Sequence, residues 1–279
     1  MSFTKYTTDL ALERCLADSS LTEGIKMRKS GNEEVDITHI TVLTDSAAER
    51  LGKPVGEYYT LEMTCFSDDA PLSEKRIEAI NSVITKLLPR KGTVLVAGIG
   101  NSEMTSDALG PMTASAIFAT RHISANLRRQ LGFGGELRSV AAVSTGVLGK
   151  TGIETGEYIK CVCSAVRPAA VITVDALAAS ELSRLGTTVQ ICNTGISPGS
   201  GVGNCRKRID ETLLGVPVIA VGVPTVANLG GRGGGESSDF VVTPKDVDSL
   251  VKNAASLLAF SINSALQPAL SAQDIYSLS

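Results

Sequence analysis

Short, almost uninterrupted runs of Val, Ile and Ala constrain the fold of this chain more than any other feature. They occur at residues 93–97, 170–174 and 216–223. A strand that buries only one face alternates apolar with polar residues, whereas these runs do not, so both faces of their sheet should be covered. Segments with the apolar spacing of helices lie between the runs. We therefore expect an α/β fold of three layers, in which a mostly parallel sheet is flanked by helices.

The same patterns predict the order of the elements along the chain. Strands are expected at 37–43, 93–97, 140–143, 170–174, 188–192 and 216–223. Helices are expected at 73–88, within 107–129, at 155–166 and at 247–266. No linker-like stretch divides these elements, which predicts a single domain.

Composition excludes several classes of function. The 279 residues carry a formal net charge of −3, which provides no basic footprint for nucleic acid. The chain has neither the apolar core of a secretory signal nor a run of about 18 apolar residues, so we expect a cytoplasmic protein without a membrane partner. With two His, and six Cys that form no CxxC pair, we expect no metal site and no cofactor.

Two familiar motifs each fail at one residue. The Gly-Ile-Gly at 98–100 follows an expected strand, but Glu103 replaces the third glycine of a dinucleotide fingerprint and would face the pyrophosphate. The Gly-Ile-Ser-Pro-Gly at 195–199 matches the nucleophile elbow of serine hydrolases. Its Pro198 lacks the backbone N–H that the oxyanion hole requires. Neither a dinucleotide site nor a serine nucleophile is therefore expected.

Two aspartates follow expected strands, and each begins an Asp-Ala-Leu tripeptide. Asp107 stands before a helix, where it could be a helix cap or a functional group. Asp175 directly follows the run 170–174, where an idle carboxylate would cost several kcal/mol of desolvation. Ligands of open α/β sheets bind at the carboxyl ends of the strands. Two carboxyl groups brought together there can share a proton, so that one activates a water as general base. Glu103, Glu154 and Glu157 are other acidic candidates.

Several blocks of the chain closely resemble the germination protease family. They are residues 98–101, 105–111, 149–155, 174–178, 187–190, 193–204 and 222–226. The resemblance runs from about Tyr6 to about Ile275. It implies an atypical aspartic endopeptidase with a fold similar to that of hydrogenase-maturation proteases, and it selects Asp107 and Asp175 as the catalytic pair.

The resemblance also implies a biological role. Germination proteases initiate the degradation of small acid-soluble spore proteins, so the expected location is the cytoplasm of the forespore or spore core, and the expected assembly is a homotetramer. The family is made as a zymogen that processes itself at a Thr-Asp-Leu-Ala-x-Glu motif, which residues 8–13 match. We therefore expect cleavage between Asp9 and Leu10, with residues 1–9 as a prosegment and residues 10–279 as the protease domain.

Other residues are candidates for holding a substrate. Glycine-rich loops at 149–152 and 195–203 could present backbone N–H groups to an oxyanion. An acidic residue before the cleaved bond calls for a cationic pocket, which residues 206–208 could form, although they could equally be a solvated charge run. The candidates for substrate or oxyanion binding are Glu154, Thr155, Gly199, Gly201 and Arg206. Two rival functions stay open: a metal-dependent maturation peptidase, and an inactive protein that binds spore proteins.

Overall fold

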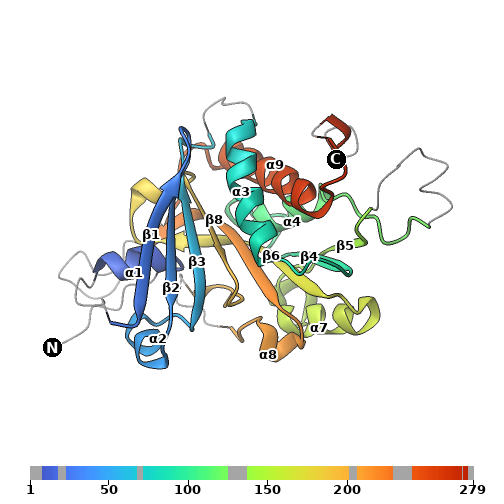
Figure 1. The fold of residues 1–279 in the computed structure, drawn as a ribbon, viewed down its shortest axis with the longest axis horizontal. Helices are drawn as coiled ribbons and strands as arrows, with labels where there is room; N and C mark the ends of the chain where they lie inside the picture. The colour runs from blue at the N-terminus through green and yellow to red at the C-terminus, as the bar shows by residue number, and fades with distance from the viewer. Residues whose placement is uncertain are drawn as a thin grey trace.

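The computed structural model describes residues 8–17, 23–67, 72–124, 137–200, 206–228, 241–271 and 273–275. Its strands form one nine-stranded sheet in the order β1-β2-β3-β7-β8-β6-β4-β5, with β9 paired to β8. Helices lie on both sides of this sheet (Figure 1). The strands are β1 (Ile25–Gly31), β2 (Asp36–Val42), β3 (Gly56–Glu62), β4 (Val94–Gly98), β5 (Val140–Ser144), β6 (Ala170–Ala179), β7 (Thr188–Cys192), β8 (Val218–Asn228) and β9 (Val241–Val242).

The helices alternate with the strands along much of the chain, as the sequence predicts. The α-helices are α1 (Ala11–Ala17), α2 (Asp45–Leu51), α3 (Glu74–Leu87), α4 (Leu109–Ser115), α6 (Leu148–Thr151), α7 (Thr155–Val166), α8 (Glu211–Leu214) and α9 (Val247–Leu266). Two short 3₁₀ helices are η1 (Thr105–Asp107) and η2 (Leu182–Arg184). In the part of the chain that is described, no helix combines the length and the apolar character needed to cross a membrane.

One half of the sheet is parallel. The strands β5, β4, β6 and β8 pair side by side in the same direction. Almost every residue of β4, β6 and β8 is buried, which is the reason that their sequences are continuous apolar runs. For this half the predicted α/β arrangement is confirmed.

The other half is antiparallel, so the sheet as a whole is mixed rather than mostly parallel. The strands β1, β2, β3 and β7 pair antiparallel, and β7 joins β8 in the same way. Antiparallel strands can leave one face to solvent. The alternating burial along β2 and the exposure of nearly all of β1 show this. Because β1 carries so little apolar sequence, no strand is predicted at residues 25–31.

Alternation of side chains divides the core between the two faces of the sheet. On β6, Ile172 and Val174 belong to the large core beneath α3, α4 and α9. Val171 belongs to a smaller core on the opposite face, near α7 and α8. Since successive side chains of a strand point to opposite faces, Asp175 lies on the same face as Val171.

The helix expected within residues 107–129 is present as α4, which covers only the start of that range. Helix α4 ends at Ser115, because the side chain of Asn263 on α9 takes over the hydrogen bonding of the following turn. Its Oδ1 accepts from the Phe118 N–H at 2.9 Å, and its Nδ2 donates to the Ala116 carbonyl at 3.0 Å. Residues 125–129 lie outside the described part of the chain.

Candidate functional site

Asp175 lies at a break in the sheet, although not at the end of its own strand as the sequence suggests. Strand β6 continues to Ala179 because β8 accompanies it. On its other side, the last residue of β4 pairs with Val174. Asp175 is therefore the first residue of β6 that has no partner on β4. It lies next to the carboxyl end of β4, and α/β proteins bind ligands at such strand ends.

Asp107 is the last residue of η1, and its side chain lines the same cavity as that of Asp175. Its Oδ2 accepts a hydrogen bond from the Asn101 N–H at 2.8 Å. Gly100 makes this approach possible, since its φ is 125° and a Cβ there would lie 2.1 Å from the Asp107 carbonyl oxygen. Helix α4 starts at Leu109, with Ala108 as its N-cap residue and no capping side-chain bond. The helix-cap interpretation of Asp107 is therefore wrong.

Burial favours the protonated form of both carboxyl groups. Asp175 is only 5% exposed. Its pKa is raised well above the usual value, first by desolvation and then by the negative charges of Asp107 and Asp9. Desolvation also raises the pKa of Asp107, against the opposing effects of the Asn101 N–H and the Arg206 charge. The charge of Asp107 thus contributes to the raised pKa of Asp175, which is the more strongly shifted of the two.

A cavity of about 320 Å³ opens in front of the two aspartates. Its polar lining includes Asp9, Asp107, Thr155, Asp175 and Arg206. Gly199 also lines it, together with apolar residues such as Ile99, Met104 and Val147. The structure therefore brings together most of the residues that the sequence selected, in a space large enough for a segment of peptide.

Some of the other candidates lie elsewhere. Glu154 precedes α7 and is not among the residues that line this cavity. Gly201 lies outside the described residues. Arg208 lines a neighbouring cavity, whereas Lys207 is exposed. Glu103 forms an ion pair with Lys150.

The segment from Thr8 to Glu13 occupies the groove beside the aspartates. The Asp9 N–H donates to the Ala178 carbonyl at 2.9 Å, and the Ala178 N–H donates to the Asp9 carboxylate at 2.9 Å. These two bonds attach the segment to the carboxyl-terminal end of β6. Leu10 and Ala11 have no exposed surface. The expected cleavage point is therefore buried against the same strand that carries Asp175.

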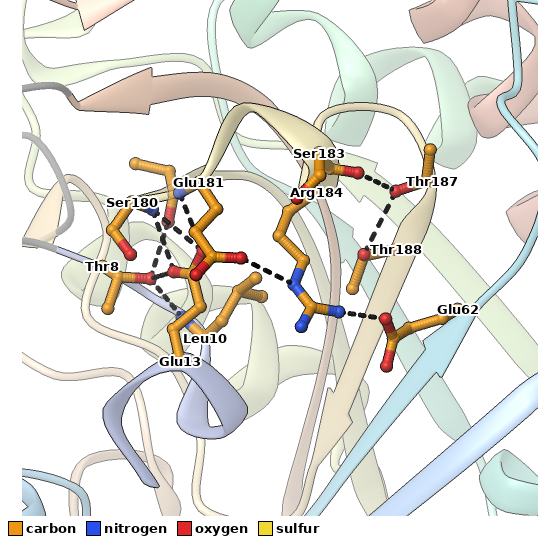
Figure 2. A network of polar contacts seen from close by, with 11 residues as sticks. Thr8, Leu10, Glu13, Glu62, Ser180, Glu181, Ser183, Arg184, Thr187 and Thr188 are labelled. Carbon is orange, nitrogen blue, oxygen red and sulfur yellow. Dashed lines mark hydrogen bonds and ion pairs between the residues drawn. The ribbon is translucent and has the colours of Figure 1, made fainter. Parts of the chain in front are cut away.

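Glu13 fastens the carboxyl-terminal side of this segment. Its carboxylate accepts from the Ser180 N–H at 2.9 and 3.1 Å and from the Glu181 N–H at 2.9 Å. The Thr8 hydroxyl donates to the same carboxylate. Figure 2 shows these contacts, with Glu13 beneath the turn formed by Ser180 and Glu181. The last residue of the Thr-Asp-Leu-Ala-x-Glu motif thus has a structural role that its spacing does not reveal.

A second cavity, of about 310 Å³, is also lined by Asp9. Four cationic residues line it, namely Arg14, Lys53, Arg206 and Arg208. Arg206 belongs to both cavities. Cationic residues therefore surround a cavity beside Asp9, some of them from elements that the sequence patterns did not predict. The Asp9 carboxylate itself accepts from the Ala178 N–H and the Ser200 hydroxyl.

Two residues that hold the segment, Lys53 and Gln190, belong to no sequence motif for catalysis or binding. The Lys53 Nζ and the Gln190 Nε2 both donate to the Asp9 carbonyl oxygen, at 2.8 and 2.9 Å. Lys53 follows the unpredicted helix α2, so no pattern marks it. Gln190 offers a signal, because a lone amide interrupts the buried run Thr-Val-Gln-Ile-Cys of β7.

The two histidines do not contribute to this region. Within the described residues, neither His39 nor His122 lines the two cavities. His39 instead stacks on Tyr59, with 4.1 Å between ring centroids. Among the described residues there is also no cluster of three or more His, Cys, Asp or Glu side chains arranged to hold a metal ion. The carboxyl pair is thus the main candidate for chemistry.

Comparison with known proteins adds independent findings. The family model of germination proteases matches residues 7–230. A germination protease of Caldanaerobacter subterraneus subsp. tengcongensis is 41% identical over 316 residues, covering 97% of this chain and 97% of the relative. A germination protease of Clostridium acetobutylicum is 35% identical over 319 residues, covering 96% of this chain and 97% of the relative.

One solved structure is also similar, namely the [NiFe] hydrogenase maturation protease HycI of Thermococcus kodakarensis. It is 18% identical, and the match covers 66% of this chain and 98% of HycI with a TM-score of 0.39. The expected likeness to hydrogenase-maturation proteases is therefore found. At this TM-score it is too weak to support conclusions about activity, and the α/β class rests on the strand pairing described above.

Proposed function

The chain belongs to the germination protease family and is therefore a peptidase, and we propose that Asp107 and Asp175 activate the water with which it cleaves peptide bonds. The observation that carries this proposal is the shared cavity of the two carboxyl groups, together with the raised pKa of Asp175. Two neighbouring carboxyl groups do not ionise equally easily, and a pair of this kind can divide the roles of acid and base.

The electrostatics suggest how the roles are divided. Asp175 is almost completely buried, and the charges of Asp107 and Asp9 add to the effect of burial in raising its pKa, which suits it to the role of acid. Burial also raises the pKa of Asp107, but Asp107 is closer to solvent, and the Asn101 N–H and the Arg206 charge oppose the rise, so it ionises more easily than Asp175. Asp107 would take a proton from the water as the water oxygen attacks the peptide carbon. Asp175 would then protonate the departing amide nitrogen.

The buried segment suggests what is cut first. Asp9 lines the cavity that holds both catalytic candidates, and it lies at the position where the family motif predicts self-processing. We infer that the chain is a zymogen, that residues 1–9 are its prosegment, and that cleavage between Asp9 and Leu10 leaves residues 10–279 as the active domain. The cationic residues around Asp9, Arg206 among them, would favour substrates with an acidic residue before the cleaved bond.

The wider role follows from the family. Small acid-soluble spore proteins are the proposed substrates, and the forespore or spore core is the proposed location. A homotetramer is the proposed assembly. None of these assignments requires a cofactor, because the carboxyl pair supplies both the acid and the base.

Separate Asp107→Asn and Asp175→Asn variants test the carboxyl pair. The purified full chain is incubated with a small acid-soluble spore protein, and mass spectrometry follows both the substrate and the amino terminus of the chain. We expect each variant to lose at least about 10³-fold in cleavage rate with unchanged circular dichroism, since each removes an acid–base group. Asp248→Asn, on the exposed surface of α9, is the matched control.

The outcomes separate the alternatives. An Asp175→Asn variant that cleaves within tenfold of the wild-type rate would rule out the carboxyl pair. A stable complex without fragments would identify a binding protein instead. Fragments that appear only after nickel or zinc is added would identify a metal-dependent peptidase.

A further inference from the structure

The carbonyl oxygen of Asp9 is held by two side-chain donors from the antiparallel half of the sheet. Lys53 Nζ lies 2.8 Å from this oxygen, and Gln190 Nε2 lies 2.9 Å from it. The same carbonyl group belongs to the peptide bond between Asp9 and Leu10. When a nucleophile attacks such a carbonyl carbon, negative charge develops on the oxygen that these donors contact.

Strand register sets Gln190 near the catalytic pair. Gln190 on β7 pairs with Gly222 on β8, and Gly222 pairs with Asp175 on β6. Residues paired in this way share one face of the sheet. Gly222 lies between them and has no side chain to fill the space. Gln190 and Asp175 can therefore approach the same chain segment from its two sides.

Gln190 also fixes the residues after the bond. While its Nε2 donates to Asp9, its Oε1 accepts from the Ala11 N–H at 2.7 Å. One amide side chain thus spans Leu10 and contacts the backbone on both sides of it. This double contact leaves the Asp9 carbonyl little freedom to turn away from its donors.

Lys53 supplies a positive charge to the same oxygen. Its pKa falls to about 8, chiefly because burial desolvates the ammonium group, while the negative charge of Asp9 opposes that shift. The group therefore remains mostly protonated at neutral pH. A charged donor in desolvated surroundings stabilises a developing anion far more strongly than it does a neutral carbonyl.

We propose that Lys53 and Gln190 form the oxyanion hole for cleavage of the bond after Asp9. The inference rests on the proposed function. Water adds to the Asp9 carbonyl carbon, its proton passes to Asp107, and the carbonyl oxygen becomes an anion held by the two donors. The carbon–nitrogen bond then breaks, the Leu10 nitrogen takes a proton from Asp175, and the oxyanion returns its electron pair to the carbon to form the new Asp9 carboxyl group.

The glycine-rich loops are the competing source of donors. The loop at 149–152 lines neither of the two cavities that Asp9 borders, whereas Lys53 and Gln190 line the second of them. Gly199 lines it, but among the described loop residues 195–200 no backbone N–H donates to the Asp9 carbonyl. Side-chain donors therefore take the place that the sequence assigned to loop amides.

Two variants test the pair in the full chain. Lys53→Met removes the charged donor. Gln190→Glu removes the Nε2 donor but keeps an oxygen that can accept from Ala11. The first-order rate of conversion of residues 1–279 to residues 10–279 is followed by mass spectrometry. We expect each variant to lose about 10²- to 10³-fold, the usual effect of removing one oxyanion donor. Lys252→Met, exposed on α9, is the charge-matched control.

A pH series distinguishes this role from a merely structural one. The contribution of Lys53 requires its proton, so the wild-type rate should fall as the pH rises through about 8. A Lys53→Arg variant should recover part of the rate and should not show this fall, because the guanidinium stays charged. This variant also keeps the test decisive if Lys53→Met does not fold.

The results separate this inference from the proposal on which it depends. If Asp175→Asn still processes itself, the carboxyl pair is wrong. If Asp175→Asn is inactive while Lys53→Met and Gln190→Glu both cleave within threefold of wild type, only the oxyanion hole is wrong. Identical pH profiles for the wild type and Lys53→Arg would also contradict it.

Discussion

The two halves of the sheet contribute different parts of the candidate site. The parallel half carries Asp175 directly and places Asp107 beside it through the close approach at Gly100. The antiparallel half provides Gln190 and, after α2, Lys53, which contact the chain segment in the groove. The acid–base candidates therefore lie around the carboxyl end of β4, whereas the side chains that hold the peptide come from β7 and from the loop between α2 and β3.

Gly222 is the place where the two halves meet, so a change there should disturb both. A Cβ at this position would lie 2.6 Å from Leu177 Cγ and 2.7 Å from the Asp175 carbonyl oxygen. We expect Gly222→Ala to reduce the free energy of unfolding by about 1–3 kcal/mol through overpacking. We also expect a loss of at least tenfold in the self-cleavage rate, because the spacing between Asp175 and Gln190 changes.

Thermal unfolding and the mass-spectrometric assay measure the two effects of this substitution. Gly149→Ala is the matched control for stability, since no atom lies within 4 Å of the added Cβ. Wild-type stability and cleavage in Gly222→Ala would show that the two halves are not coupled at this glycine.

The pH dependence of stability probes the parallel half alone. Below pH about 4, Asp175 is protonated in both the folded and the unfolded chain and contributes nothing. As the pH rises, the unfolded carboxyl ionises, while the folded group keeps its proton up to its raised pKa. The free energy of unfolding should therefore fall by up to about 1.4 kcal/mol per pH unit in that window.

An Asp175→Asn variant has no carboxyl group to ionise at this position, so its stability should lack this dependence on pH. It should unfold at a higher temperature than the wild type at pH 7, and the difference should vanish towards pH 4. Calorimetry over a pH series measures it. A variant less stable than the wild type at neutral pH would mean that the Asp175 carboxylate is stabilised in the fold.

The smallest effect is expected at the outer edge of the antiparallel half. Lys75 on α3 pairs with Glu33 in the turn between β1 and β2, where their side chains are 46% and 81% exposed. Exposed pairs contribute little, so Lys75→Ala should change the free energy of unfolding by no more than about 0.5 kcal/mol and leave cleavage unchanged. A larger loss in urea unfolding would show that this edge supports the site.

The same division explains how much of the fold could be predicted. Helices 155–166 and 247–266 and strand 188–192 have the predicted bounds, because their apolar patterns are dictated by burial on fixed faces. β1 and β3 lack such runs. β1 is mostly exposed and takes its place from pairing with β2, a long-range contact that leaves no local pattern.

The candidate site was predictable to a similar extent. Asp107 and Asp175 stand beside recognisable strands, and the family motif marks Asp9 and Leu10. Lys53 carries no such mark. It reaches Asp9 because α2 packs against α1 through a shared apolar cluster, so its position depends on tertiary packing. The role of Gln190 likewise depends on a register across three strands.

The anchoring of Leu10, Ala11 and Glu13 would make a cut after Asp9 permanent. Leu10 and Ala11 are enclosed in the core, and Glu13 is tied to the turn after β6. Of the two ends created, the one at Leu10 would stay buried, whereas Thr8 and Asp9 are held by hydrogen bonds that water can replace, so residues 1–9 could dissociate. Dilution of that short peptide would make the reverse reaction negligible. Each processed molecule would then keep an irreversible change at its own amino terminus, whatever happened afterwards in the solution around it.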